Sequence, residues 1–246
     1  MRLDGKVALI TGAGGDLGRG MACRFAQVGA RVVVNDINQD RALETVELIA
    51  GQGGQAMAYC ADLTRSEEVN AMVAQIIKKW KQIDILVNNA GDIRDAMLIK
   101  MSDADWDFVI DLNLKGAFLC ARSVASHMIE RKYGKIVNIS SMAYKGNIGQ
   151  TNYVSAKAGI VGLTQALGLE LARYGITVNC VAPGLIDTPK ARQLDPKTLS
   201  MLVNKTPMRR MGEIIDIANA VLFLVSDQSG YISRQTIHVS GGMEGF

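Results

Sequence analysis

A glycine-rich segment near the N-terminus of this 246-residue chain points to its fold: Thr11-Gly12-Ala13-Gly14-Gly15-Asp16-Leu17-Gly18. It follows the short apolar run Val7–Ile10 and opens a helical pattern over residues 17–28. Glycines at such a junction let backbone N–H groups at a helix N-terminus approach a pyrophosphate closely. A glycine cluster also occurs in ordinary tight turns, but its place between a strand and a helix favours a dinucleotide-binding turn.

An acid ends the second expected strand, residues 31–35. Asp36 stands 24 residues after the first glycine of the turn, where a carboxylate can accept hydrogen bonds from the adenosine ribose and repel a 2′-phosphate. Because Gly14, Gly15 and Ile37 carry no charge, we expect no cation beside that phosphate. The sequence therefore predicts that NAD(H) is preferred over NADP(H). The alternative is that Asp36 only caps a helix.

Short β-branched runs alternate with longer amphipathic stretches along the whole chain. Further strands are expected at residues 56–60, 83–87, 135–139, 177–181 and 236–239, with helical stretches between them. Near-continuous apolar strands that alternate with helices are typical of a parallel sheet covered on both faces. We therefore predict an α/β fold, a Rossmann-like doubly wound parallel sheet of about seven strands that forms a single domain over residues 1–246.

The composition excludes several classes of protein. Lys plus Arg number 27 and Asp plus Glu 24, and 48% of the residues are hydrophobic. The chain is therefore expected to fold, and its net charge of +3 gives no case for nucleic acid as a partner. Apolar runs are too short to span a membrane, and charges near the N-terminus leave no room for a signal peptide, so we expect a cytoplasmic protein.

Cysteine and histidine are too sparse for a metal site. Zinc ligands usually come in pairs at short spacing, and no such pair is present. We predict no metal and four buried thiols in a reducing compartment. The residues concerned are His127, His238, Cys23, Cys60, Cys120 and Cys180.

A tyrosine and a lysine form the candidate proton-handling pair. Tyr153 and Lys157 stand four residues apart at the head of a helix that runs to about Arg173, so they share one helix face. A nearby ammonium favours phenolate and lowers the pKa of a tyrosine toward the range of a general acid/base. The pair could be an ordinary surface contact, but it follows a strand that ends in Ser140-Ser141, which favours a site at the sheet edge.

These motifs together closely resemble the short-chain dehydrogenase/reductase family, over essentially the whole chain. The shared features are the glycine turn, Asn88-Asn89-Ala90-Gly91, Asn113, Ser140-Ser141, Tyr153-x-x-x-Lys157, Pro183-Gly184 and Gly241-Gly242. Residues 91–95, 149–153 and 181–188 look most like bacterial 3-oxoacyl-[acyl-carrier-protein] reductases and acetoacetyl-CoA reductases.

The resemblance implies a role for each catalytic residue. Tyr153 would be the acid/base for the substrate oxygen, and Lys157 would lower its pKa and hold the nicotinamide ribose. Ser141 would hydrogen-bond the substrate oxygen, and Asn113 would hold a water that links Lys157 to bulk solvent. Counting along the strand selects Ser141, whereas counting back the family's usual distance from Tyr153 selects Ser140. We favour Ser141, because loops absorb deletions and strands do not.

The resemblance also implies the cofactor contacts. Turn residues would meet the pyrophosphate, residues after the third strand the adenine, and residues after the sixth strand the carboxamide. The implied set is Gly12, Gly14, Gly15, Asp16, Leu17, Asp36, Ile37, Asp62, Leu63, Asn89, Ala90, Gly91, Tyr153, Lys157, Pro183, Gly184, Ile186 and Thr188.

One residue departs from the family pattern, which has a third glycine where this chain has Asp16. A carboxylate beside the pyrophosphate either points away, as an acid favoured at a helix start, or weakens dinucleotide binding.

The proline-bearing stretch over about residues 187–212 is too long for a tight loop, and we expect a lid-like insertion over the site. Residues 190–210 carry six cations and one acid, a net charge of +5. Such a run of charges often only forms a solvent-exposed face of the protein. The sharper alternative is that it meets an anionic handle, either the phosphates of CoA or the phosphopantetheine of a carrier protein.

We therefore expect an NAD(H)-dependent oxidoreductase that interconverts a secondary alcohol and a ketone on a 3-oxoacyl thioester, as in fatty acid metabolism. One alternative is an NAD-dependent dehydrogenase of a small cyclic or aromatic secondary alcohol. Another is a dinucleotide-binding module that has lost turnover through Asp16. The resemblance also implies a homo-oligomer, commonly a tetramer.

Overall fold

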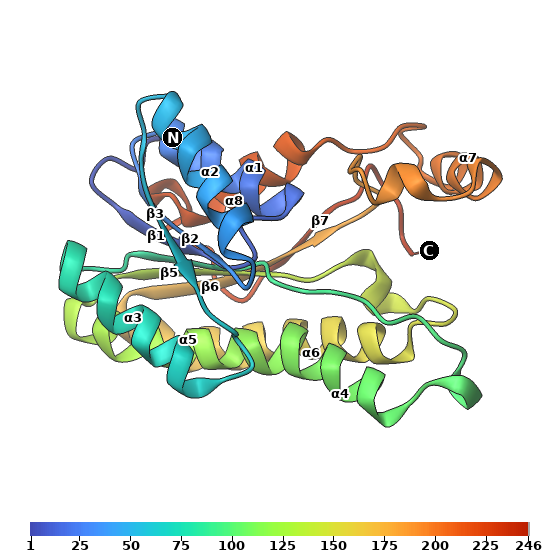
Figure 1. Ribbon diagram of the computed structural model, residues 1–246, viewed down its shortest axis with the longest axis horizontal. Coiled ribbons are helices and arrows are strands. Elements are labelled where there is room, and N and C mark those ends of the chain that lie inside the picture. Colours follow the sequence, from blue (N-terminus) through green and yellow to red (C-terminus); the bar gives the residue numbers. More distant parts are fainter. Residues whose placement is uncertain (246) are drawn as a thin grey trace.

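The computed structural model describes residues 1–245, and its centre is one parallel sheet of seven strands (Figure 1). The strand order is β3-β2-β1-β4-β5-β6-β7. This confirms the predicted α/β doubly wound fold. The strands are β1 (Val7–Ile10), β2 (Arg31–Asp36), β3 (Gln55–Cys60), β4 (Ile85–Asn88), β5 (Gly134–Ile139), β6 (Ile176–Pro183) and β7 (Thr236–Val239).

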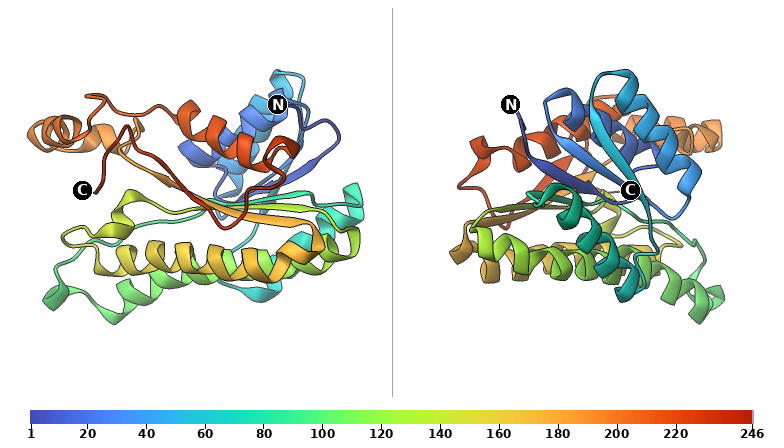
Figure 2. Two further views of the ribbon diagram at one scale, coloured as in Figure 1. Left: turned by 180° about the vertical axis from the view of Figure 1, so that it is seen from behind. Right: turned by 60° about the vertical axis from the view of Figure 1, so that its left-hand side comes forward.

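Helices cover both faces of the sheet (Figures 1 and 2). One layer contains α1 (Asp16–Gln27), α2 (Gln39–Gly51) and α8 (Ile214–Val225). The other contains α3 (Ser66–Trp80), α4 (Asp103–Ile110), α5 (Gly116–Arg131) and α6 (Thr151–Leu171). A further helix, α7 (Pro196–Lys205), lies beyond the end of the sheet in the expected insertion.

Alternation of side chains along the strands builds two main apolar cores, one on each face of the sheet. In β1, Ala8 and Ile10 pack with Phe25 of α1, whereas Val7 and Leu9 pack on the opposite face with the cluster that contains Ile76 of α3. Successive side chains of a strand point to opposite faces, so strands covered on both sides are apolar throughout. Both layers are therefore held to a sheet whose strands are almost fully buried.

The strand order reverses between β1 and β4, and this reversal positions the site. The chain runs outward from β1 through β2 to β3, and then returns to place β4 on the other side of β1. The connections on the two sides of this point leave the sheet toward opposite faces, which opens a crevice at the carboxyl ends of the strands. The glycine turn after β1 lies at this crevice.

The prediction of four buried thiols is wrong for two of them. Cys120 and Cys180 are buried, and burial raises the pKa of these thiols to about 12 and about 11, respectively. Cys23 is only half-buried on α1, and Cys60 is exposed because it ends β3 at the edge of the sheet. Nothing in the residue pattern of β3 distinguishes an edge strand from a central one. Among residues 1–245, no helix has the length and apolar character needed to cross a membrane.

Candidate active site

A cleft of about 1470 Å³ opens at the carboxyl ends of the strands. It brings together residues from the glycine turn, the ends of β2, β4 and β5, the head of α6 and the segment after β6. Every predicted site residue lines it except Gly14 and Asn113, which lie directly behind its wall. Side chains that are far apart in the sequence therefore meet where the fold places a ligand.

The glycine turn is fitted closely against the end of β4. Gly12 has a φ of +62°, and a Cβ built on it would lie 2.8 Å from the Cα atom of Ala90. Thr11 Oγ1 accepts hydrogen bonds from the backbone N–H groups of Asn89 (2.9 Å) and Ala90 (3.0 Å). These contacts bring the two loops together and leave the first N–H groups of α1 facing the cleft, which is the geometry that phosphate binding needs.

Asp36 is held by backbone donors on both sides. Its Oδ2 accepts from Gly14 N (3.1 Å) and its Oδ1 from Asn38 N (3.0 Å). The residue that caps α2 is Asn38, whose side chain accepts from Arg41 N. Asp36 is therefore not the helix cap, and its carboxylate lies at the cleft wall where a ribose would be bound.

Arg41 corrects the expectation that no cation lies near this acid. It belongs to the first turn of α2, and it lines the same cleft as Asp36. A Cβ built on Gly14 would lie 2.8 Å from both Arg41 Cβ and Asp36 Oδ2, and one built on Gly15 would lie 3.8 Å from Arg41 Nη2. The expectation considered only positions next to the turn and the strand end, whereas the helix returns Arg41 to the turn from five residues beyond the acid.

The two serines at the end of β5 have different surroundings. Ser140 is buried, and its hydroxyl donates to the backbone carbonyl of Lys157 (2.8 Å). Ser141 is half-buried, and its Oγ accepts from Ala143 N (3.1 Å), which leaves the hydroxyl hydrogen free to donate. A hydrogen bond from Ser141 also acts on the pKa of Tyr153. Ser140 thus ties β5 to α6, and Ser141 faces the tyrosine.

Tyr153 and Lys157 lie side by side at the head of α6, with the lysine Nζ 5.5 Å from the centre of the tyrosine ring. Burial raises the pKa of Tyr153 to about 12, and the hydrogen bond with Ser141 offsets this only in part. We expected Lys157 to lower the pKa of Tyr153, but in the protein alone that pKa is raised. Burial also lowers the pKa of Lys157 to about 8, because the ammonium loses its hydration.

Lys157 is fixed from the side of the sheet. Its Nζ donates to the backbone carbonyl of Ile139 (3.0 Å). A Cβ built on Gly91 would lie 3.3 Å from this Nζ and would collide with Asn113 Oδ1. Because Gly91 has no side chain, the Lys157 ammonium and Asn113 Oδ1 can face the same small space.

Asn113 lies in a five-residue π-helical turn between α4 and α5, Asp111–Lys115. Its amide nitrogen donates to the carbonyls of Asp92 and Val109, both at 2.9 Å. Its Oδ1 is buried without a hydrogen-bond partner among the described residues. Such turns occur frequently at functional sites, and here the turn aims an acceptor toward the space beside Lys157.

The outer part of the cleft is apolar with a charged rim. Side chains from the loops after β4 and β5 face side chains from the insertion across the mouth: Ile93, Ile148, Leu194, Met201 and Leu202. Lys190 Nζ lies 3.2 Å from Asp92 Oδ1, so an ion pair joins the two walls. This end of the cleft can take a molecule with an apolar body.

The residues present fit a nicotinamide dinucleotide. Pockets for single small ligands usually measure about 300–1,000 Å³, so the larger cleft has room for a dinucleotide and a second molecule. The open turn at the helix N-terminus suits the pyrophosphate, Asp36 suits a ribose, and the acceptor on Asn113 is available for a polar group or a water.

Comparison with known proteins agrees with this geometry. A family profile described as enoyl-(acyl carrier protein) reductase matches residues 12–244. The chain belongs to the short-chain dehydrogenase/reductase family. It is an NAD(P)-dependent oxidoreductase of this type, and the family binds nicotinamide dinucleotides.

Two relatives match over nearly the full length of both chains. One is the (2S)-[(R)-hydroxy(phenyl)methyl]succinyl-CoA dehydrogenase subunit BbsD of Thauera aromatica, 49% identical over 98% of each chain. The other is the 3-oxoacyl-[acyl-carrier-protein] reductase FabG of Thermotoga maritima, 41% identical over 99% of each chain.

Two solved structures share the fold closely. A putative gluconate dehydrogenase from Agrobacterium tumefaciens has a TM-score of 0.96 at 37% identity, covering 99% of this chain and 97% of its own. Levodione reductase has a TM-score of 0.95 at 32% identity, covering 99% of each chain. The names of these four proteins indicate very different substrates.

Proposed function

We propose that this protein is an NAD(H)-dependent oxidoreductase that interconverts a secondary alcohol and a ketone on an acyl thioester. The observation that carries the proposal is the meeting of Ser141, Tyr153 and Lys157 in the cleft, beside the loop that holds Asn89 and Gly91. These groups can bind a carbonyl oxygen and deliver a proton to it.

The residues take these roles in the reductive direction. When bound, the nicotinamide supplies a hydride from its C4 carbon to the carbonyl carbon. The carbonyl oxygen accepts hydrogen bonds from Ser141 and Tyr153, and it takes the phenolic proton of Tyr153 as it becomes the alcohol oxygen. With a pKa of about 12, Tyr153 holds that proton at neutral pH. The alcohol is oxidised by the same steps in reverse.

Lys157 and Asn113 restore the proton. With a pKa of about 8, Lys157 is mainly charged at pH 7 and can stabilise the phenolate that Tyr153 leaves. The free Oδ1 of Asn113 suits a water between this ammonium and solvent.

The preference for NADH over NADPH rests on Asp36. Its carboxylate is anchored at the cleft wall by Gly14 and Asn38, so it cannot easily turn away from a 2′-phosphate. Arg41 acts in the opposite direction, because its guanidinium can attract the same phosphate. We therefore propose a preference for NADH that is smaller than the acid alone would give.

The acyl thioester is proposed from the relatives and from the shape of the cleft. The names of BbsD and FabG have in common a thioester together with a hydroxyl or oxo group. The substrate in the BbsD name is also a benzylic alcohol. It therefore combines a thioester, our first expectation, with an aromatic secondary alcohol, our alternative. The apolar mouth around Ile148, Leu194 and Met201 suits an acyl body of this kind.

Steady-state rates with NADH test the proposal. The panel contains acetoacetyl-CoA, 3-oxo-3-phenylpropionyl-CoA and cyclic ketones without a thioester. We expect kcat/KM to be highest for a thioester. If only the cyclic ketones react, the protein is instead a dehydrogenase of small cyclic alcohols, which the likeness to levodione reductase favours. If NADH binds but no ketone oxidises it, the protein is a non-catalytic dinucleotide-binding module.

Three further expectations remain proposals: a single domain over residues 1–246, a role in fatty acid metabolism and a homotetramer. The oligomeric state can be measured by light scattering together with size-exclusion chromatography.

A further inference from the structure

The cations of the insertion differ in what their side chains contact. Lys190 pairs with Asp92, Arg192 with Asp187 and Arg210 with Asp216. Arg209 donates to the backbone carbonyl of Asn204 at the end of α7. Four of the six cations therefore have contacts within the fold. The other two cations of the insertion are Lys197 and Lys205. Within residues 1–245, their side chains make neither an ion pair nor a hydrogen bond.

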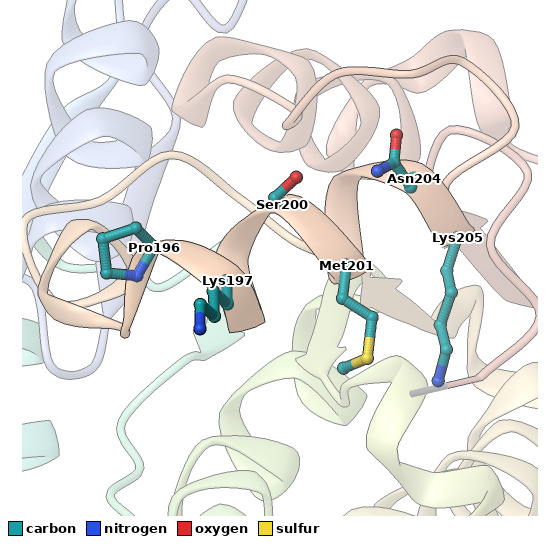
Figure 3. Close-up of a pocket in the computed structure, with 6 residues that line it drawn as sticks. All are labelled: Pro196, Lys197, Ser200, Met201, Asn204 and Lys205. Carbon is teal, nitrogen blue, oxygen red and sulfur yellow. The ribbon is translucent and has the colours of Figure 1, made fainter.

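These two lysines lie on one side of α7. Lys197, Met201 and Lys205 are spaced four residues apart and point to the same side of the helix, and Ser200 and Asn204 point to the other (Figure 3). Eight residues of α-helix separate the two ammonium-bearing positions by about 12 Å along the axis. With Pro196, these residues line an open groove of about 670 Å³.

The groove is continuous with the cleft. Met201 and Lys205 line both the groove on α7 and the large cleft that contains Tyr153. A ligand that extends out of the cleft past Met201 therefore meets a groove with Lys205 at one end and Lys197 at the other. Free cations beside an apolar entrance complement a ligand whose apolar end reacts inside and whose anionic end stays in solvent.

Resting on the proposed function, we infer that the Lys197–Met201–Lys205 face of α7 binds the phosphates of coenzyme A, with the pantetheine arm passing Met201 into the cleft. Coenzyme A carries phosphate at two places, the diphosphate and the ribose 3′-phosphate, and the helix offers two separate ammonium groups. A carrier protein presents a single phosphate and needs a docking surface of about 800 Å². The groove has instead the size of a small-ligand pocket.

Binding of coenzyme A to the NAD⁺-loaded enzyme tests the inference directly. The double variant Lys197→Gln/Lys205→Gln is compared with a control of equal charge, Lys78→Gln/Lys79→Gln, on exposed positions of α3. An exposed ion pair changes an equilibrium constant by up to about fivefold. We therefore expect the Kd for coenzyme A, measured by calorimetry under reducing conditions, to rise about tenfold in the first variant and to stay unchanged in the control.

Kinetics separate this inference from the proposed function. With acetoacetyl-CoA the lysine variant should raise KM far more than with the N-acetylcysteamine thioester, which lacks phosphates, and salt should shrink the difference. If CoA thioesters react but the lysines have no effect, the inference is wrong and the function stands. If no thioester reacts but CoA binding depends on the lysines, the proposed function is wrong and the inference about CoA binding stands. No binding of CoA to the parent enzyme, or a loss confined to a carrier-protein thioester, overturns the inference.

Discussion

The backbone N–H of Gly14 donates a hydrogen bond of 3.1 Å to Asp36 Oδ2 and so joins the phosphate turn to the end of β2. Any side chain at position 14 would strike this carboxylate or the Cβ atom of Arg41, since a built Cβ lies 2.8 Å from each. The glycine is therefore required by its neighbours as well as by a ligand. The hydrogen bond fixes the acid beside the turn, and the Cβ atom of Arg41 lies next to the same glycine.

We expect substitutions of Asp36 and Arg41 to change the preference for NADH over NADPH in opposite directions. Asp36→Ala removes the repulsion of a 2′-phosphate and should narrow the ratio of kcat/KM for NADH over NADPH. Arg41→Ala removes the attraction of that phosphate and should widen the same ratio, by about two- to fivefold for an exposed charge. Asp40→Ala, on an exposed position of the same helix, serves as the control. Equal ratios in all three variants would remove both residues from cofactor selection.

Tyr153→Phe should keep the fold and the affinity for NADH but lower kcat by at least ~10²-fold, the usual scale for loss of a general acid. Tyr144→Phe is a matched control, because the Tyr144 hydroxyl bonds His238 and Tyr144 is not among the residues that line the described cleft. Single-turnover rates and NADH fluorescence titrations measure the two quantities. A near-normal rate for Tyr153→Phe would exclude Tyr153 as the proton donor.

Lys157→Met should abolish activity and stabilise the protein at pH 7. Burial lowers the pKa of Lys157 from 10.5 to about 8, so folding must bury a charge below pH 8. Between pH 8 and 10.5 the unfolded state binds more protons at this residue than the folded state does, and the free energy of unfolding therefore rises with pH. We expect the variant to gain about 2 kcal/mol at pH 7, after loss of the hydrogen bond to Ile139.

Urea unfolding at pH 7 and pH 10 measures this effect. The advantage of Lys157→Met should shrink across that interval, whereas the exposed control Lys78→Met should show no such change. A destabilised variant at pH 7 would mean that the contacts of the ammonium outweigh its burial.

Asp16→Gly should tighten NADH binding. Asp16 is the exposed first residue of α1 and lines the cleft beside the turn. Two charges ~5 Å apart repel by a few kcal/mol at an effective dielectric near 20, and the helix N-terminus offsets only about 0.3–1 kcal/mol of this. Asp16→Asn should recover part of the gain, and high salt should reduce it. Equal affinity in NADH titrations of all three proteins would show that the carboxylate already points away.

The sequence was sufficient for the fold because both signals that define it are local. Apolar runs predict the strands, and the helical stretches that separate them predict the parallel arrangement. The segments that form the cleft were also predictable, since they follow strand ends that must meet at one edge.

Two features depended on packing between elements and could not be predicted in this way. Arg41 reaches the turn only because α2 starts at Gln39 and runs back past Gly14. The raised pKa of Tyr153 reflects burial, which four-residue spacing does not reveal. By contrast, counting along β5 favoured Ser141 over Ser140, and in the structure it is the Ser140 hydroxyl that donates to the carbonyl of Lys157.

All ten residues of α7 keep part of their surface in solvent, whereas Lys157 and the ends of β4, β5 and β6 are buried. Substitutions at exposed positions usually change stability by no more than about 0.5 kcal/mol. The outer half of the site can therefore accumulate mutations that the inner half cannot tolerate. A descendant of this protein could exchange the residues of one short helix, acquire a different substrate and keep its hydride chemistry intact, which gives the fold a built-in route to new specificity.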